Sequence, residues 1–134
     1  MARIYVARST ALGKWASDVG LSKHIYKIGV TDDDPKALVA AGWAGETDWT
    51  LVKKQPVENL SETDAIGRVA LKEKLIEPRL YPKLRGAEGV FKVLPTNVES
   101  RRLVQRALAG EAERVVRKLK PGDFADYLIQ IAAK

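Results

Sequence analysis

His-Ile-Tyr-Lys-Ile-Gly-Val-Thr-Asp-Asp-Asp-Pro, residues 24–35, is the stretch that decides the fold, since it joins a strand, a polar turn and a helix-opening proline. In an extended chain, alternate side chains point to opposite faces. One face then carries the apolar, core-like set His24, Tyr26, Ile28 and Val30, and the other carries Ile25, Lys27 and Gly29. Glycine inside a strand often marks a close approach by a ligand or another backbone. Two interpretations stay open for Lys27 and Gly29: the floor of a site, or a strand edge with a solvated lysine.

The composition is that of one soluble globular domain. The chain has 134 residues, of which 46% are hydrophobic and 30% charged, which suits a single compact core rather than two. No apolar run approaches the roughly 18–20 residues of a membrane span. Residues 1–10 do not resemble a signal peptide. We therefore expect a cytoplasmic protein with no membrane partner.

The residue inventory limits the chemistry. Cysteine is absent and His24 is the single histidine, which excludes disulfides and thiolate metal sites and argues against a His-rich zinc site or a Ser-His-Asp triad. Catalysis would have to rest on Tyr, Lys, Arg, Asp or Glu. Lys and Arg outnumber Asp and Glu by 23 to 17, a formal charge of +6, and such a balance favours polyanionic partners such as nucleic acid.

The remaining patterns predict a small α+β protein with a mostly antiparallel sheet. A polar connection is expected at residues 9–23. The predicted strands cover residues 3–8, 24–30, 49–57 and 90–93, and the predicted helices cover residues 35–41, 61–77, 97–119 and 123–133. The order gives a β-β-α-β-α-β core. We expect residues 1–95 to form this domain and residues 96–134 to be a helical extension packed on it.

The helix predicted at residues 61–77 carries an unusual carboxylate. Ser61 is a suitable N-cap and Pro78 a stop signal. At 100° per residue, Glu73 falls near the centre of an apolar stripe formed by Ala65, Ile66, Val69 and Ile76. Burying an unpaired charge is expensive. Glu73 therefore needs a partner, and three kinds remain open: a cation such as Lys27, several hydrogen-bond donors, or a metal ion.

Five motifs in order resemble the GIY-YIG nuclease superfamily, in the phage-type branch whose second motif is written Lys-Ile-Gly. They are Arg3-Ile4-Tyr5, Tyr26-Lys27-Ile28-Gly29, Asp34-Pro35 with the Trp-containing strand after Gly45, the helix with Glu73, and Arg85-Gly86-Ala87-Glu88-Gly89-Val90-Phe91. The resemblance covers residues 2–95 and leaves residues 96–134 outside it.

The resemblance implies a site for metal-dependent hydrolysis of phosphodiester bonds. Tyr5 matches the tyrosine that orients or deprotonates the attacking water, and Glu73 matches the glutamate that holds Mg²⁺ or Mn²⁺. Lys27 aligns with the second tyrosine. Lys36 stands where the family has an arginine, and a lysine does not reproduce an arginine's bidentate grip on phosphate. Strand parity allows Tyr5 and Lys27 to share the open face while Tyr26 turns inward.

Nucleic acid is the expected partner, with DNA favoured over RNA, and the basic residues expected to contact it are Arg3, Lys72, Lys83 and Arg85. Arg3 replaces the first glycine of the family motif. Three functions stay open at this point: a metal-dependent endonuclease, a catalytically degenerate domain that binds DNA or RNA, and a protein-interaction module built from the C-terminal helices.

Overall fold

The structure, a computed structural model, describes residues 2–21, 23–84, 87–108 and 119–133 and has an α+β fold, as the sequence predicts. The strands are β1 (Arg3–Ser9), β2 (Ile25–Thr31), β3 (Trp49–Pro56), β4 (Lys74–Leu75) and β5 (Val90–Lys92). The helices are α1 (Thr10–Asp18), α2 (Pro35–Ala41), α3 (Glu62–Ala70), the short 3₁₀ turn η1 (Pro82–Leu84), α4 (Pro95–Leu108) and α5 (Pro121–Ala132). The sheet order is β3-β1-β2-β5-β4. All its pairings are antiparallel.

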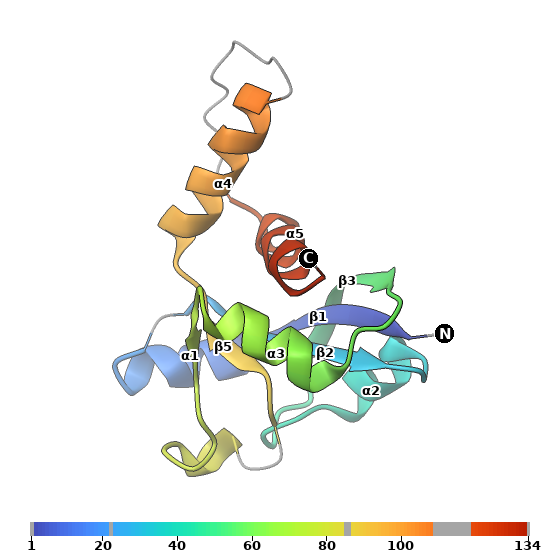
Figure 1. Ribbon diagram of the computed structural model, residues 1–134. Helices are drawn as coiled ribbons and strands as arrows, with labels where there is room; N and C mark the ends of the chain where they lie inside the picture. The colour runs from blue at the N-terminus through green and yellow to red at the C-terminus, as the bar shows by residue number, and fades with distance from the viewer. Residues whose placement is uncertain (1, 22, 85–86, 109–118, 134) are drawn as a thin grey trace.

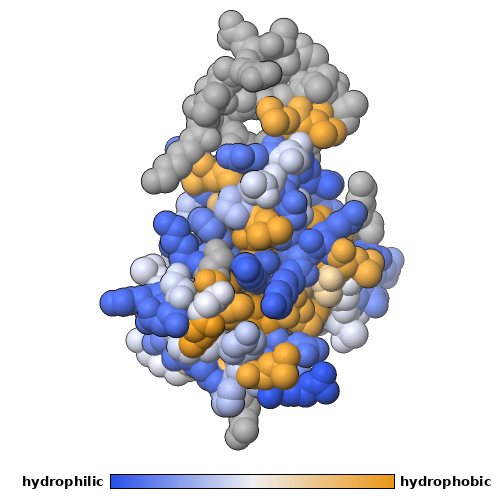
Figure 2. Space-filling view, turned by 90° about the vertical axis from the view of Figure 1, so that its left-hand side faces the viewer, coloured by the Kyte–Doolittle hydropathy of each residue, from blue (hydrophilic) through white to orange (hydrophobic). Residues whose placement is uncertain are grey.

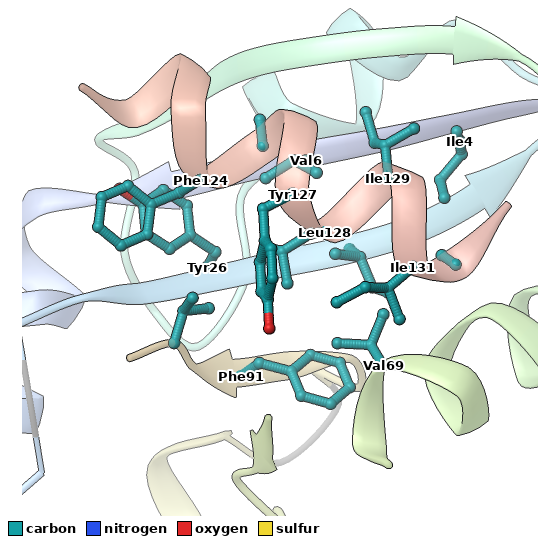
Figure 3. Packing of buried hydrophobic residues seen from close by; sticks show 14 of the residues in the cluster. Ile4, Val6, Tyr26, Val69, Phe91, Phe124, Tyr127, Leu128, Ile129 and Ile131 are labelled. Carbon is teal, nitrogen blue, oxygen red and sulfur yellow. The ribbon is translucent and has the colours of Figure 1, made fainter. Parts of the chain in front are cut away.

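Helices cover both faces of the sheet (Figure 1). On one face α3 and α5 pack on a core cluster that includes Ile4, Val6, Ile28 and Phe91. Figure 3 shows this cluster, with side chains of α5 directed onto the strands. On the other face α1 and α2 pack on a second cluster. Because α5 contributes Phe124 and its neighbours to the first cluster, the C-terminal helix is part of the core.

The alternation predicted for β2 is confirmed. Tyr26 and Ile28 are buried in the first cluster, and Val30 packs against it. Lys27 and Gly29 lie on the opposite face, where β1 brings Tyr5 opposite Gly29 and Ala7 opposite Lys27. The period of two therefore places Tyr5, Lys27 and Gly29 on one face of the sheet.

Side-chain caps begin the helices where the sequence supplies them. Asp34 caps α2 by accepting from the backbone N–H of Lys36, and Pro35 is the first helical residue. Ser61 caps α3 by accepting from the N–H of Asp64. Such caps satisfy N–H groups that have no partner inside the helix. They fix the starting points of both helices.

Two sequence predictions are wrong. Residues 9–23 are not merely a polar connection: they hold α1, which Ser9 caps through the N–H of Leu12. The helix predicted at residues 61–77 ends at Ala70, because the chain turns there and Leu75 pairs with Phe91 in the sheet. Pairing with β5 outweighs the local helical pattern. Glu73 is therefore in the turn between α3 and β4 and not on a helix.

Beyond β5, α4 begins at Pro95, two residues before the predicted start, and the predicted continuation of this helix to residue 119 falls largely outside the described residues. Across the part of the chain that the structure describes, none of the helices has the length and apolar character needed to cross a bilayer.

Candidate active site

A cleft lies over the face of the sheet where β1 and β2 meet α2 and the first turn of α3. Its volume is about 350 Å³. It is lined by Tyr5, Lys27, Val30, Thr31, Leu38, Trp43, Glu62 and Glu88. The structure thus brings together two of the predicted catalytic residues, Tyr5 and Lys27, and adds two carboxylates from elsewhere in the chain.

Gly29 makes room for this arrangement. A Cβ atom at this position would lie 2.5 Å from Cζ of Tyr5 and 2.7 Å from Oε1 of Glu62. Both distances are far shorter than carbon contacts in folded proteins allow. The phenol and the carboxylate therefore meet directly above Gly29. The close approach expected from a glycine inside a strand is made by the protein's own side chains.

Glu62 is held at the cleft by the uncovered edge of β2. The strand β5 pairs only with residues 25–27 of β2. The backbone N–H of Val30 lies beyond that pairing and donates to Oε1 of Glu62 at 3.2 Å. No hydrogen bond to Oε2 of Glu62 occurs among the described residues. One carboxylate oxygen thus orients the side chain, and the other is available to a ligand.

Lys27 is buried, with 4% of its surface exposed. Its Nζ donates to the backbone oxygen of Glu88 at 2.7 Å and lies 4.8 Å from the ring centroid of Trp43. Burial lowers the pKa of Lys27, while the negative charges of Glu62 and Glu88 act in the opposite direction. Desolvation disfavours the ammonium form, and the aromatic face and the carboxylates partly offset that cost. The cleft therefore holds a fixed, partly compensated cation.

Tyr5 is held by stacking on Trp43, with ring centroids 6.1 Å apart. Burial, with a smaller contribution from the charge of Glu62, raises the pKa of Tyr5 to about 12. The phenol is then protonated at neutral pH. At neutral pH the Tyr5 hydroxyl therefore keeps its proton and can donate a hydrogen bond.

Glu73 does not line the cleft. Its carboxylate is buried and accepts hydrogen bonds from the backbone N–H of Leu94 at 2.9 Å, from Nδ2 of Asn97 at 2.8 Å and from the hydroxyl of Tyr127. Figure 3 shows Tyr127 pointing from α5 toward Phe91. The sequence left three kinds of partner open for Glu73, and the structure shows the second kind, several hydrogen-bond donors. These hydrogen bonds connect the turn between α3 and β4 to α4 and α5.

The other predicted site residues are dispersed. Arg3 pairs with Thr31 at the border of the cleft. Lys36 is exposed on the first turn of α2 and does not line the cleft. Lys72 is exposed after α3, and Lys83 forms an ion pair with Glu46 at 3.1 Å. Arg85 lies outside the described residues.

The carboxylates of the cleft suit a hard cation only with help from a substrate. The described residues contain no cluster of three or more His, Asp or Glu side chains able to hold a metal ion. Mg²⁺, however, commonly takes one or two carboxylates and completes its shell with waters and substrate phosphates. Glu62 and Glu88 provide two. This donor set fits Mg²⁺ or Mn²⁺ bound together with a phosphate.

Sequence reasoning missed Glu62. A signal existed in Ser61-Glu62-Thr63-Asp64, which places Glu62 at the first turn of a helix. This signal does not show that the N–H of Val30 lacks a partner strand and can bind Glu62. That depends on where β5 pairs along β2.

The raised pKa values make alkaline stability a test of the buried tyrosines. Burial raises the pKa of both Tyr5 and Tyr26 to about 12, so above pH 10 the unfolded chain loses protons that the folded chain keeps. We expect the free energy of unfolding to fall by about 1 kcal/mol per pH unit per tyrosine between pH 10 and 12. Below about pH 10.5 the lowered pKa of Lys27 has the opposite effect on the free energy of unfolding, which it makes rise with pH, because the unfolded chain keeps a proton that the folded chain loses.

Urea unfolding at a series of pH values measures this decline. The Tyr5→Phe variant should show a shallower decline than the wild type, because one of the tyrosines whose pKa is raised by folding is gone. An identical slope in both proteins would mean that Tyr5 ionises in the folded state as it does in the unfolded chain.

The fold and the cleft define a class: an α+β protein with a five-stranded antiparallel sheet and an amphoteric cleft of phenol, ammonium and carboxylate groups on one face. Comparison with known proteins adds no particular relative, since no family model, curated protein or solved structure matches this chain.

Proposed function

We propose that this protein acts on nucleic acid as a GIY-YIG-like, metal-dependent endonuclease that hydrolyses phosphodiester bonds. The observation that carries the proposal is the meeting of Tyr5, Lys27 and the Glu62 carboxylate in one cleft. Phosphoryl chemistry needs positive charge beside the phosphate and an oriented water. The cleft offers a cation, a hydrogen-bond donor and a hard oxygen ligand for these tasks.

Each side chain has a role that follows from its surroundings. Lys27 is fixed by the Glu88 carbonyl and the Trp43 ring and would neutralise a phosphate oxygen. Tyr5, protonated at neutral pH, would donate to the attacking water or to the phosphate. Glu62 and Glu88 would hold Mg²⁺ or Mn²⁺, which lowers the pKa of a bound water when present. In this proposal Glu62 takes the metal-binding role that the resemblance gave to Glu73.

The charge of the chain supports a nucleic-acid partner. The formal charge of +6 favours association with phosphates, and Arg3 stands beside the cleft residue Thr31. We propose DNA in the cytoplasm as the substrate, in line with the resemblance. Lys36 and Lys72 are both exposed and would contact the phosphates of the DNA backbone outside the cleft.

Nicking of supercoiled plasmid in the presence of Mg²⁺ or Mn²⁺ tests the proposal. We expect the wild type to nick, and the Glu62→Gln variant to lose at least about 100-fold in rate, because the amide removes a metal ligand and a charge. Glu58→Gln makes the same chemical change at an exposed position and should nick normally. Equal nicking by both variants would refute the role of Glu62.

If the plasmid stays intact under all these conditions, the endonuclease proposal is refuted. The second candidate, a catalytically degenerate binding domain, is favoured by the absence of an arginine at Lys36 and by the exposure of that lysine outside the cleft. It predicts salt-dependent retardation of DNA on a gel without cutting. If the protein neither cuts nor binds DNA at low salt, the protein-interaction module remains as the third hypothesis.

A further inference from the structure

A second hollow, here called the basic pocket, lies at the opposite end of the β1–β2 pair from Val30 and Thr31. Its volume is about 510 Å³, within the range of small-molecule sites. It is lined by Arg8, Ser9, Thr10, Gly13, Lys14, Ser17, Lys23, His24, Ile25, Tyr26, Leu119, Pro121 and Phe124. None of these residues belongs to the cleft described above, and the proposed function makes no use of them.

The polar side of the basic pocket is cationic. Arg8, Lys14 and Lys23 line it, and no ion pair holds any of the three among the residues that the structure describes. Arg8 is only partly exposed. Three positive charges around one hollow raise the local concentration of anions. This charge arrangement calls for an anionic ligand.

Two aspartates near the basic pocket accept hydrogen bonds from the starts of α1 and α5, and the charge of Asp123 reaches the lining residue Tyr26. Asp48 accepts from the hydroxyl of Ser9 and from the N–H of Ala11 at the start of α1. Asp123 accepts from the N–H of Lys120 at the start of α5. Neither aspartate is among the lining residues. The described lining of the pocket therefore contains three cations and no carboxylate.

Another part of the lining, here called the apolar wall, is apolar. Leu119, Pro121, Phe124 and Tyr26 form it. Phe124 stacks on His24 and on Tyr26, with ring centroids 5.1 and 5.0 Å away, so the three rings form one cluster. Figure 2 turns the α1 side of the molecule toward the viewer, and hydrophilic residues surround separate hydrophobic patches there. A pocket lined by both cations and apolar side chains suits a phosphate joined to an apolar ring.

We propose that the basic pocket binds a nucleotide through its phosphate and its base. Arg8, Lys14 and Lys23 hold the phosphate, with Arg8 able to bind two oxygens at once. The base lies against the apolar wall of Leu119, Pro121 and Phe124, and the exposed hydroxyls of Thr10 and Ser17 reach the sugar.

Calorimetric titration of the full chain with adenosine 5′-monophosphate, without metal, tests this site. We expect the nucleotide to bind at least about tenfold more tightly than adenosine or inorganic phosphate alone, since each lacks one half of the recognised chemistry. Absence of nucleotide binding would overturn the proposal. So would equal affinity for inorganic phosphate, which would make the pocket a site for bare anions.

Variants locate the binding. Arg8→Ala should weaken nucleotide binding about tenfold, whereas Arg79→Ala, the same change at an exposed position, should leave it unchanged. Lys14 is exposed on α1, so Lys14→Ala keeps the helix and should also weaken binding. Unaltered binding by both Arg8→Ala and Lys14→Ala would overturn the proposal.

Competition identifies the source of the nucleotide. A short oligonucleotide with a 5′-phosphate that displaces the monophosphate, beside a 5′-hydroxyl oligonucleotide that does not, would assign the pocket to strand ends. Absence of displacement by either would assign it to free nucleotides. Both results support nucleotide recognition. Because Glu62→Gln should bind the monophosphate as the wild type does, failure of this inference and failure of the endonuclease are separable.

Discussion

Replacing Glu73 by alanine is expected to lower the free energy of unfolding by about 3 kcal/mol. The change leaves the N–H of Leu94, the amide of Asn97 and the hydroxyl of Tyr127 without their shared acceptor; the Tyr127 bond is buried and the other two are partly buried. Each buried donor left unpaired costs about 1–3 kcal/mol. A typical domain is stable by only about 5–15 kcal/mol. The variant should therefore fold but unfold at a clearly lower urea concentration.

The position of Glu73 explains why so much depends on one carboxylate. Leu94 immediately precedes α4, whose N-terminal end carries a partial positive charge that a carboxylate stabilises. Tyr127 lies on α5, and burial, together with its hydrogen bond to Glu73, raises the pKa of its phenol. One side chain thus connects the turn before β4 with two helices that are distant in sequence.

Urea denaturation followed by circular dichroism measures this effect. Glu58→Ala removes an exposed carboxylate and should change the free energy of unfolding by less than about 0.5 kcal/mol. Tyr127→Phe removes a single donor while keeping the ring, so a loss of about 1 kcal/mol is expected. A Glu73→Ala protein with wild-type stability would show that the three donors find other acceptors and that this network contributes little.

Replacing Gly29 by alanine is expected to disrupt the cleft and to cost about 2 kcal/mol. The added methyl group would overlap the ring of Tyr5 and the carboxylate of Glu62. Tyr5 is only 3% exposed and is confined by Trp43, so neither ring can move without disturbing its neighbours. Overfilling a packed site costs about 1–3 kcal/mol. Tyr5 and Glu62 would be pushed apart, and any chemistry that needs both would be lost.

Two measurements check this result without relying on catalysis. Urea denaturation gives the stability, and the absorbance of ionised tyrosine between pH 9 and 12 follows Tyr5, whose pKa should fall from about 12 toward the usual 10 once the ring leaves its buried position. Gly67→Ala is the matched control. Nothing lies near a Cβ atom at Gly67 on α3, so alanine there should stabilise by about 0.5–1 kcal/mol.

A Gly29→Ala protein with unchanged stability and an unchanged tyrosine titration would mean that the space above Gly29 is larger than the structure indicates. Since Gly67→Ala makes the same chemical change, any general effect of adding a methyl group appears in both variants. The difference between them isolates the close approach of Tyr5 and Glu62.

Sequence alone determined the features that depend on near neighbours in the chain. The period of two in residues 24–30 placed Tyr26 and Ile28 in the core and put Lys27 and Gly29 on the face of Tyr5. Asp34 with Pro35, and Ser61, began their helices where capping requires. The same local signals could have revealed α1, because Ser9 is a good N-cap and no proline interrupts residues 10–18.

Only the tertiary structure decided which carboxylate reaches the cleft. The local pattern predicted a helix that continues past Glu73. In the structure Leu75 pairs with Phe91, the helix ends at Ala70, and Glu73 faces Leu94, Asn97 and Tyr127. Glu62 faces Tyr5 because β5 stops short of Val30 and leaves its N–H unpaired. These partners are separated by roughly 20 to 60 residues, and contacts at that range are set by how strands and helices pack, which periodicity and caps do not encode.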